Sequence, residues 1–393
     1  MTTTRETTVV VIGAGVAGLT LGNLLLRNGV DCIVLERQSR QYADQRQRAG
    51  TIDSFGVRLL REWGLGDAMF TDDVVAEDEG GMWIDGEAMP IEVDQEDGDE
   101  DGSVYLPQQV LVRNLTDAFL ASGGDLRFEA SDVGLSNLDD HRPRVAYRDT
   151  AGALRTIEAG FVAGADGDRG VSRASIPAHA LTRYTHEFGY SWLSIQAGVA
   201  ADPSGMAIHE RGFAAMIPRG SSASRLYLQV PGTDTVADWP DERIWAEMAA
   251  RFGTAMPDGP IIDKRVIPLR SAVTVPMQCG KLFLLGDAAH IVPPMSAKGM
   301  HLALHDADAL ARALILFTRE SDASLLDSYS DDALQHIWNY QAFAAWITNL
   351  MHNAGDPSYE GEFAKHIARA ELQRQFLSPA ANRLFIELTS GLN

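Results

Sequence analysis

Cysteine is scarce in this chain, which has only Cys32 and Cys279 among its 393 residues. Two cysteines cannot build the disulfide framework of a small secreted domain, so they fit a reducing compartment. No stretch approaches the apolar length that a membrane-spanning helix requires, and the segment Met1–Thr8 has no apolar signal core. We therefore expect a cytoplasmic protein without a membrane partner.

Basic residues are also too few to balance the acidic ones. The chain has 33 lysines and arginines against 54 aspartates and glutamates, which gives a formal net charge of −21. This surplus of negative charge argues against a nucleic-acid partner, whose phosphates it would repel. The composition is otherwise that of a globular protein, 45% hydrophobic and 22% charged, and the length allows two or three packed domains.

The strongest local pattern lies near the N-terminus. The β-branched run Val9–Ile12 predicts a buried parallel strand, and the apolar run Leu19–Leu26 predicts a helix. Asn28–Gly29 is typical of a helix end, and Val30–Leu35 predicts the second strand. This order of elements is that of a nucleotide-binding unit of an α/β protein.

A glycine-rich turn joins the first strand to the helix. Gly13 permits the tight turn, Gly15 lets a pyrophosphate approach the backbone, and Gly18 lets the helix pack closely on the strand. The helix N-terminus offers free N–H groups to phosphates. Glu36 follows Gly18 by 18 residues, where an acid can accept hydrogen bonds from an adenosine ribose. A glycine-rich turn without a ligand is the alternative, which this complete context disfavours.

Two later segments end buried strands in an aspartate. Phe161–Gly167 contains Asp166, and Lys281–Asp287 ends in Gly286–Asp287 before a helix predicted from Ala297 to Leu310. Further helices are predicted by the apolar spacing at Ser54–Trp63, at Gln108–Leu120 and through Ser324–Leu392. In the last of these, a stripe predicts core or interface: Ile337, Tyr340, Phe343, Ile347 and Leu350.

The middle of the chain alternates between apolar and polar residues. Tyr190–Val199, Gly212–Ile217 and Arg225–Val230 read as strands, and Gly220–Ser222 can turn the last two into a hairpin. The pattern predicts a second, antiparallel layer suited to walling a substrate pocket.

Two charged stretches leave alternatives open. Arg46 and Arg48 could bind phosphate oxygens beside the nucleotide unit, or could belong to a solvated basic loop. The acidic run from 94 to 101 predicts a solvated loop, because its spacing does not match a calcium-binding EF-hand. We expect no metal site.

Three motifs together resemble the fingerprints of the single-component, FAD-dependent aromatic hydroxylases: Gly13–Ala14–Gly15, Asp166–Gly167 and Gly286–Asp287. The resemblance runs almost end to end. Other matching segments are Leu35–Gln38, Arg46–Gly50, Ser175–Pro177, Arg211–Phe213, Trp239 with Asp241–Arg243, Pro268–Ser271, Gly286–Pro294 and Ala297–Gly299.

The resemblance implies an α/β fold with a Rossmann-like FAD-binding domain of the p-hydroxybenzoate hydroxylase type. It predicts an FAD-binding domain at 1–178 with a return segment at 276–322, an antiparallel β substrate domain at 179–275 and a helical region at 323–393. It also suggests a homodimer.

The family's functional residues can be placed by position. The residues that resemble cofactor-binding ones are Gly13, Gly15, Ala17, Gly18, Glu36, Arg37, Arg48, Gln108, Asp166, Gly286, Asp287, Lys298, Gly299 and Met300. Pro294 and His301 would lie at the reacting ring, and the helix near Gly299 would direct its N-terminus at the flavin pyrimidine edge, stabilising the anionic reduced flavin. Arg37, Gln38, Asp166 and Arg270 resemble residues that meet NADPH.

The family's chemistry needs NADPH, FAD and O2 besides the aromatic substrate. NADPH reduces FAD, O2 adds at flavin C4a, and the hydroperoxide transfers its distal oxygen to an electron-rich aromatic ring. The site must exclude water, or the intermediate collapses to peroxide.

The substrate pocket departs from the family. Where the family has two relay tyrosines, this chain has Met206 and Thr389, and the relay histidine aligns near Asp78. The carboxylate-contacting serine is Ile217, and the asparagine near the flavin is His301. The arginine for the substrate carboxylate survives as Arg219, with Tyr227 beside it, and Met216 and Met295 would make the pocket more apolar.

These departures favour a monooxygenase for a carboxylated, apolar, non-phenolic aromatic substrate, such as an indole, carbazole or aniline of specialised metabolism. One alternative is a 3-hydroxylase of 4-hydroxybenzoate-type phenolic acids with a substituted proton relay. Another is a flavin oxidoreductase of this fold, such as a halogenase or a reductase of isoprenoid chains, although the halogenase segment Trp-x-Trp-x-Ile-Pro is missing. A third is a non-enzymatic binding protein of the dinucleotide fold.

Overall fold

The computed structural model describes residues 4–45, 50–70, 75–76, 80–89, 102–139, 142–257, 259–352 and 359–390. The chain forms two compact units, which are treated separately below. Unit 1 comprises 1–77, 100–185 and 271–342, and unit 2 comprises 78–99, 186–270 and 343–393. The domain boundaries at 178, 275 and 322 stay a prediction. The acidic run from 94 to 101 lies outside the described residues, as do Arg46, Arg48 and Asp78.

Unit 1 is built on a mostly parallel sheet in the order β17-β18-β11-β1-β2-β8. Its strands are β1 (Thr4–Ile12), β2 (Cys32–Leu35), β8 (Asp125–Arg127), β11 (Leu154–Gly164), β17 (Gln278–Cys279) and β18 (Leu282–Leu284). The strands predicted from the β-branched run and from residues 161–164 are parallel neighbours, with Val9 opposite Phe161. Both are buried, because parallel strands are covered on two faces.

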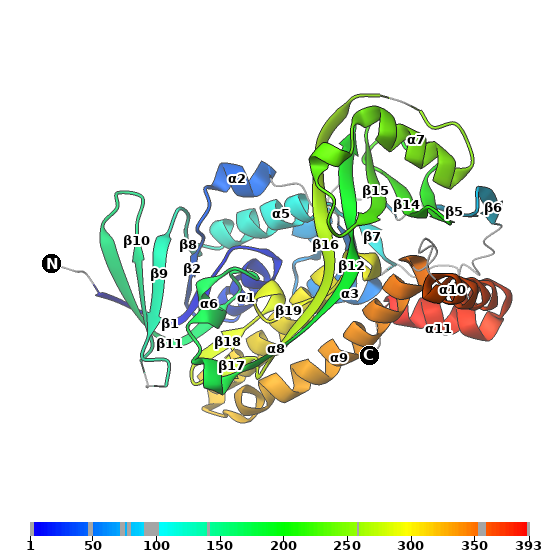
Figure 1. The fold of residues 1–393 in the computed structure, drawn as a ribbon. Helices are drawn as coiled ribbons and strands as arrows, with labels where there is room; N and C mark the ends of the chain where they lie inside the picture. Colours follow the sequence, from blue (N-terminus) through cyan, green and yellow to red (C-terminus); the bar gives the residue numbers. More distant parts are fainter. Residues whose placement is uncertain are drawn as a thin grey trace. The chain divides into compact units, whose positions relative to one another are not determined.

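An antiparallel extension continues one side of this sheet. β9 (Ser131–Ser136) and β10 (Arg144–Arg148) pair beyond β11, and Figure 1 shows them standing beside β1. A separate small sheet has the order β3-β7-β4, with β3 at Thr51–Ile52, β7 at Val104–Tyr105 and β4 at Val75–Ala76.

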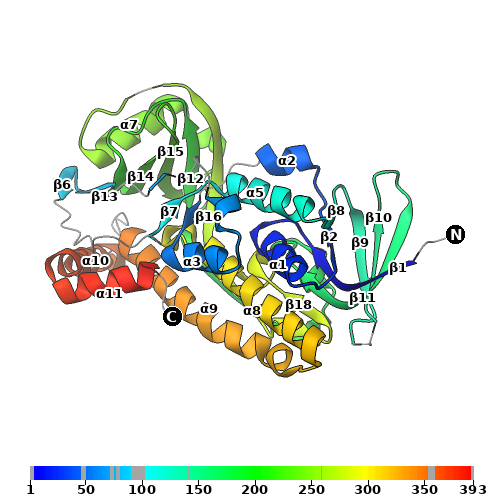
Figure 2. The ribbon, with the colours of Figure 1, turned by 180° about the vertical axis from the view of Figure 1, so that it is seen from behind.

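The helices of unit 1 include those predicted from apolar spacing. They are α1 (Val16–Arg27), α2 (Arg40–Gln45), α3 (Ser54–Glu62), α4 (Gly66–Met69), α5 (Gln108–Ala121), α6 (Val171–Ala174) and α8 (Gly299–Glu320). α1 packs against both α5 and α8, as Figure 2 shows. α8 extends ten residues beyond the predicted end at Leu310.

Unit 2 contains most of a second sheet, in which β12 and β16 also run into unit 1. From β16 the order is β16-β12-β15-β14-β13-β5-β6. The bounds are β5 Gly81–Ile84, β6 Glu87–Met89, β12 Thr182–Ala197, β13 Gly205–His209, β14 Gly212–Pro218, β15 Ser224–Pro231 and β16 Ile261–Val275. The predicted hairpin is confirmed, since β14 and β15 are antiparallel neighbours.

One face of this sheet is covered by α7 (Asp241–Phe252), as Figure 1 shows. Leu193, Ile195 and Leu228 from the strands form a core with Ile244 and Met248 from the helix. Met216 belongs to this core and is fully buried. Its predicted place in the substrate pocket beside Ile217 is therefore wrong, because successive residues of a strand face opposite sides of the sheet.

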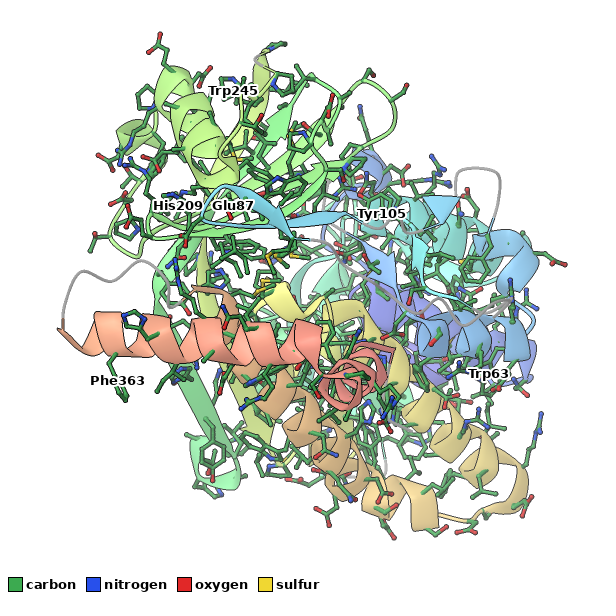
Figure 3. All side chains as sticks on the ribbon, turned by 90° about the vertical axis from the view of Figure 1, so that its right-hand side faces the viewer. Trp63, Glu87, Tyr105, His209, Trp245 and Phe363 are labelled. Atoms are coloured by element: carbon green, nitrogen blue, oxygen red, sulfur yellow. The ribbon has the colours of Figure 1, made fainter. Side chains whose placement is uncertain are left out.

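The C-terminal region is helical, as predicted, but is divided into three helices. They are α9 (Ser324–His352), α10 (Tyr359–Leu377) and α11 (Pro379–Ser390). The predicted apolar stripe of α9, from Ile337 to Leu350, is buried throughout. On α10, Phe363 projects away from the helix and is 64% exposed (Figure 3). Within the described ranges, no helix combines the length and apolar character that crossing a bilayer demands.

Candidate cofactor and substrate sites

The three glycines of the turn after β1 have different surroundings. Gly13 has a φ of +103°, and a Cβ there would lie 2.3 Å from the carbonyl oxygen of Ala165. A Cβ on Gly18 would lie 2.0 Å from the carbonyl oxygen of Gly13. Gly15 has an ordinary φ of −83°, and a Cβ there would meet no atom within 4 Å. The chain's own packing requires the first two glycines, whereas the space before Gly15 is open to a ligand.

That open space lies at the start of α1. Gly15 is the N-cap of this helix and supplies no side-chain capping bond, so the first-turn N–H groups can receive an anion. Glu36, at the end of β2, accepts hydrogen bonds of 2.8 Å from the N–H groups of Ala14 and Gln38. Its carboxylate thus fixes the turn and, being half-buried, keeps oxygen surface for a ribose hydroxyl.

The Gly286–Asp287 motif lies in the same region of unit 1. Gly286 has a φ of +55°, and a Cβ there would lie 3.3 Å from the Cβ of Ala17 in α1 and 3.6 Å from that of Ala303 in α8. The absence of a side chain at Gly286 therefore lets α1 and α8 pack closely against this turn. Asp287 follows and is exposed, although its neighbours Gly286 and Ala288 are buried. A carboxylate on an open edge between two helix starts fits the hydroxyls of a ribityl chain.

A buried ion pair holds this edge in place. Oδ2 of Asp306, which has no exposed surface, accepts from the Gly286 N–H at 2.8 Å and lies 2.6 Å from Nε2 of His290. Burial alone would lower the pKa of His290, but the Asp306 carboxylate outweighs it and the pKa is raised. The prediction from sequence missed this pair, because both residues lie in segments that only the fold brings together.

A second buried cluster lies at the start of α8. Nζ of Lys298, the N-cap residue, is 2.5 Å from Oδ2 of Asp53, and Nδ1 of His301 is 2.8 Å from the same oxygen. Lys298 and His301 are each 3% exposed, and Asp53 is 7% exposed. Asp53 is itself the N-cap of α3, where its Oδ1 accepts from the Gly56 N–H at 3.0 Å. Asp53 was not among the predicted residues.

The histidine of this cluster continues into a row of three. Nε2 of His301 lies 3.0 Å from Nε2 of His336 on α9, and the rings of His336 and His305 stack with centroids 3.7 Å apart. Burial is the largest cause that lowers the pKa of His305 and takes that of His336 to about 3. The tertiary structure assembles this row, since only His301 and His305 have helical spacing in the sequence.

The other predicted site residues of unit 1 differ in how exposed they are and in the hydrogen bonds they make. Pro294 and Gly299 are exposed, Met295 is half-buried and Met300 is 9% exposed. Gln108 begins α5, and its N–H lies 2.6 Å from where a Gly50 Cβ would be. These roles stay predictions. Arg37 is exposed, whereas the Asp166 carboxylate accepts from the Ser172 N–H at 2.9 Å and leaves its Oδ1 without a hydrogen bond among the described residues.

In unit 2, the strand register places predicted substrate residues on one face. Met206 pairs with Ala215, which pairs with Tyr227, which pairs with Ser194. These residues therefore form one row across four strands, on the face opposite Met216 and α7. The neighbouring row contains Ile217, Arg225 and Gln196. We call these two rows the open face of the sheet, because α7 does not cover them, although most of their side chains are buried.

Two arginines belong to this part of unit 2. Burial lowers the pKa of Arg219, which follows β14, to about 10. Arg225 is 3% exposed, donates from Nη1 to Ser194 Oγ at 3.3 Å, and has an Nε without a hydrogen-bond partner among the described residues. Burial also raises the pKa of the neighbouring Tyr227 despite both arginines. Arg225 was missed, although a charged residue at an inward strand position was a usable signal.

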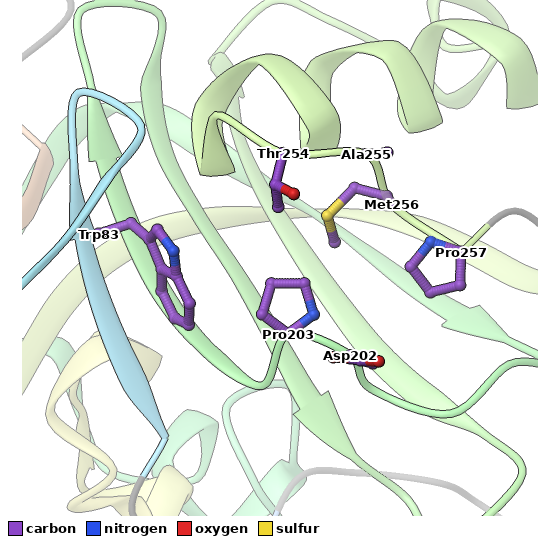
Figure 4. Close-up of a pocket in the computed structure, with 7 residues that line it drawn as sticks. All are labelled: Trp83, Asp202, Pro203, Thr254, Ala255, Met256 and Pro257. Carbon is purple, nitrogen blue, oxygen red and sulfur yellow. The ribbon is translucent and has the colours of Figure 1, made fainter.

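Thr389 and a surface hollow complete the description of unit 2. Thr389 falls in α11, but its side chain lies outside the described residues. A hollow of about 610 Å³ is lined by Trp83, Asp202, Pro203, Thr254, Ala255, Met256 and Pro257 (Figure 4). None of the predicted site residues lines this hollow, so we give it no role in catalysis.

Comparisons with known proteins identify the family of the chain. A family described as "FAD binding domain" matches residues 6–344. The chain is 35% identical to the p-hydroxybenzoate hydroxylase of Acinetobacter baylyi, over 99% of this chain and 96% of the relative. It is 30% identical to the 3-amino-4-hydroxybenzoate 2-monooxygenase of Streptomyces cremeus, over 79% of each chain. The solved p-nitrophenol 4-monooxygenase of Pseudomonas putida shares the fold, with a TM-score of 0.80 and 20% identity over the whole of both chains.

The chain belongs to the FAD-dependent aromatic hydroxylases. It is therefore a flavoprotein monooxygenase, and the predicted fold class and enzyme class are confirmed. The open space before Gly15, the exposed Asp287 and the uncapped start of α1 are the features of unit 1 that fit FAD.

Proposed function

We propose that this enzyme hydroxylates a carboxylated aromatic ring that carries its own activating nitrogen, as an indole, carbazole or aniline does, using NADPH and O2. The observation that carries the proposal is the open face in unit 2. It combines two partly or fully buried arginines with apolar side chains, and it has a methionine in the row where a proton-passing residue would be needed.

The arginines favour an anionic substrate. At neutral pH Arg219 remains charged, because even its lowered pKa of about 10 lies well above 7. Keeping the guanidinium group of Arg225, which is 3% exposed, in such surroundings is costly unless an anion pairs with it. The planar, bidentate geometry of a guanidinium matches a carboxylate.

The methionine favours a ring that needs no deprotonation. A phenol reacts well with an electrophilic oxygen only as phenolate, and an unperturbed phenol has a pKa of about 10. Met206 has no proton to pass, and its neighbours in the row are Met82 and Ala215. A ring nitrogen supplies electron density without losing a proton. The relative that acts on 3-amino-4-hydroxybenzoate supports an aromatic acid with an amino group, although that ring also carries a phenolic hydroxyl and therefore fits the second candidate below as well.

The protein's part in the reaction is to bind and orient. Bound FAD supplies the oxygen-activating redox chemistry. Gly15 and the first turn of α1 would receive its diphosphate, Glu36 a ribose and Asp287 the ribityl chain. Lys298 and the start of α8 would face the flavin pyrimidine edge, where positive charge favours the reduced cofactor.

A second candidate function is hydroxylation of a phenolic acid. The 35% identity to a p-hydroxybenzoate hydroxylase over nearly the whole chain favours it, as does the retained Tyr227. It requires a substituted proton relay. An NADPH-oxidation screen with oxygen-uptake measurement, across aromatic acids, anilines and indoles, separates the two candidates by the fraction of NADPH coupled to product.

We expect 4-hydroxybenzoate to be a poor substrate that at best triggers uncoupled NADPH oxidation. The reason is the missing route for the phenolic proton at Met206. Met206→Tyr combined with Thr389→Tyr should improve phenol turnover, if anything, and should not improve the native reaction. Product formation and peroxide release are measured together. Tightly coupled hydroxylation of 4-hydroxybenzoate by the unmodified enzyme would establish the second candidate instead.

Replacing Arg219 by alanine should raise KM for the native substrate about tenfold to hundredfold, because a charge-assisted hydrogen bond contributes about 1.5–3 kcal/mol. The effect on kcat should be smaller if the interaction is equally strong in the ground and transition states. Arg148→Ala is the matched control, since Arg148 pairs on the surface of unit 1 with Asp132, which is 76% exposed. Equal KM values for wild type and Arg219→Ala would reject the carboxylate pairing.

The proposal includes a preference for NADPH over NADH. Arg37, Gln38 and Arg270 support a preference for NADPH, because their side chains can contact a 2′-phosphate. We expect kcat/KM to be higher with NADPH than with NADH, and comparable values for the two coenzymes would reject this preference.

The exposed apolar side chains of Phe363, Ile367 and Leu384 support a homodimer, which light scattering tests. We place the enzyme in the cytoplasm, in keeping with its free cysteines.

A further inference from the structure

The histidine row in unit 1 connects a buried charge cluster with a partly exposed side chain. His301 is 3% exposed and lies between Asp53 and His336, whereas His336 is only half-buried. The site residues assigned above use Lys298 and His301 for the flavin edge but give no role to His336. A titratable ring therefore occupies the interior, and a second ring links it to the side of the protein that water reaches.

The negative charge of Asp53 assigns the protons of the resting row. The Asp53 carboxylate can only accept, so a neutral His301 carries its proton on Nδ1, 2.8 Å from that carboxylate. The contact is not aligned as a hydrogen bond. The negative charge of the carboxylate nevertheless favours the tautomer with the proton on Nδ1. Nε2 of His301 is then an acceptor. Because two Nε2 atoms 3.0 Å apart share one proton, His336 carries it and donates.

The groups that face His301 come from three elements: Asp53 from the start of α3, Lys298 and His305 from α8, and His336 and Tyr340 from α9. Asp306 and His290 lie beyond them and pair with each other. Lys298 and Asp53 cancel in charge. His301 is thus the member of the cluster that can add a positive charge when a negative charge appears near the start of α8.

We propose that His301 takes up a proton from solvent, through His336, whenever bound FAD is reduced. The proposal rests on the proposed function in one respect, the placement of the flavin pyrimidine edge at the start of α8. A hydride from the nicotinamide brings both electrons and one proton to FAD. The further proton enters at Nδ1 of His336, whose Nε2 proton passes to Nε2 of His301, and it returns to solvent when FAD is reoxidised.

The uptake has an electrochemical signature. For a two-electron couple, each coupled proton lowers the midpoint potential by about 30 mV per pH unit. Reduction with one proton therefore gives about 30 mV per pH unit, and reduction with a second proton on His301 gives about 60 mV. The steeper slope should appear over the pH interval in which His301 holds the extra proton only while FAD is reduced.

The experiment is a spectroelectrochemical titration of the FAD-loaded enzyme at a series of pH values around neutrality. We expect the slope of about 60 mV in wild type and of about 30 mV throughout in His301→Asn. His179→Asn is the matched control, because His179 is an exposed histidine of unit 1 outside the row, and it should keep the wild-type slope. If His301→Asn does not bind FAD, His301→Gln replaces it. A wild-type slope of about 30 mV throughout, or an unchanged slope without the His301 imidazole, would overturn the proposal.

The role of His336 is tested by the rate of uptake. In His336→Asn, a pH-indicator dye should report proton uptake about a hundredfold slower after rapid reduction, the lower end of what a positioned proton donor contributes. Uptake as fast as in wild type would remove His336 from the route.

Lys298→Met separates this proposal from the one it rests on. If neither Lys298→Met nor His301→Asn changes the midpoint potential at any pH, the flavin edge does not lie at α8 and the placement fails. If the potential changes but its pH slope does not, the placement holds and only the proton coupling fails. Reduction at an electrode needs neither nicotinamide nor aromatic substrate, so the substrate proposal does not affect the outcome.

Discussion

Gly15→Val protein should fold normally and purify without the yellow colour of FAD. A Cβ at this position meets no protein atom, and φ is −83°, so the fold accepts a side chain there. The side chain would instead fill the space that a pyrophosphate needs at the start of α1. We expect FAD affinity to fall by at least about a hundredfold, or about 2.7 kcal/mol. The stability of the cofactor-free protein should change by no more than about 1 kcal/mol, since valine is a poorer N-cap than glycine.

Gly18→Ala is the matched control for this prediction. A Cβ there would lie 2.0 Å from the carbonyl oxygen of Gly13, so the helix and the turn would have to separate. This variant should lose stability by about 1–3 kcal/mol or more even without FAD. Flavin absorbance after reconstitution and urea denaturation of the cofactor-free protein distinguish the two effects. Full FAD occupancy in Gly15→Val would remove the phosphate site from this turn.

Asp53→Asn should lower the free energy of unfolding of the cofactor-free protein by about 3–5 kcal/mol, the usual cost of breaking a buried ion pair on one side. The Lys298 ammonium, 3% exposed, would lose the carboxylate 2.5 Å away. Asparagine caps a helix as well as aspartate, so α3 keeps its N-cap and the loss reports the charge alone. Asp53→Ala should cost about 1 kcal/mol more, because it also removes the cap.

The matched control is Asp241→Asn. Asp241 lies 2.7 Å from Nζ of Lys264 but is 56% exposed, so its loss should cost at most about 1 kcal/mol. Urea denaturation followed by circular dichroism measures all three variants. Equal losses in Asp53→Asn and Asp241→Asn would mean that the cluster at the start of α8 is as solvated as a surface pair.

The same cluster predicts a pH dependence. Burial alone would raise the pKa of the Asp53 carboxyl, but His301 and Lys298 outweigh it and lower the pKa from 3.8 to about 2. A group with a lowered folded-state pKa stabilises the protein above its unfolded pKa, so this contribution is complete above about pH 4 and is lost as the pH falls toward 2. Its size is about 2 kcal/mol. In Asp53→Asn the acid loss of stability should shrink by that amount.

The local sequence was sufficient for elements whose signal lies within a few residues. A β-branched run predicted the second half of β1, and a short apolar run predicted the end of β11. Helical apolar spacing predicted α3 and α5 close to their observed bounds. The glycine spacing predicted the turn before α1. In the structure Gly18 lies against Gly13 of the same turn, Gly13 lies against Ala165 after β11, and Gly15 faces open space. Family resemblance added the enzyme class, which the comparisons confirm.

Alternation along β14 indicated a strand but did not by itself show which side faces the core. Met216 and Ile217 are both apolar, and only the packing of α7 on one face assigned Met216 to the core and Ile217 to the open face. The same register identified Arg225 as a neighbour of Ile217. Hydrophobicity alone cannot make this distinction when both faces of a sheet carry apolar residues.

By itself, the sequence determined the nucleotide-binding turn, the first strand–helix–strand unit and the membership of the flavin hydroxylases. Only the tertiary structure decided that Asp53 pairs with Lys298, 245 residues away, and that His301 meets His336 on another helix. The physical reason is the range of the forces that each feature records. Backbone propensity and periodicity act between near neighbours along the chain, whereas a buried charge finds its partner through the packing of whole elements.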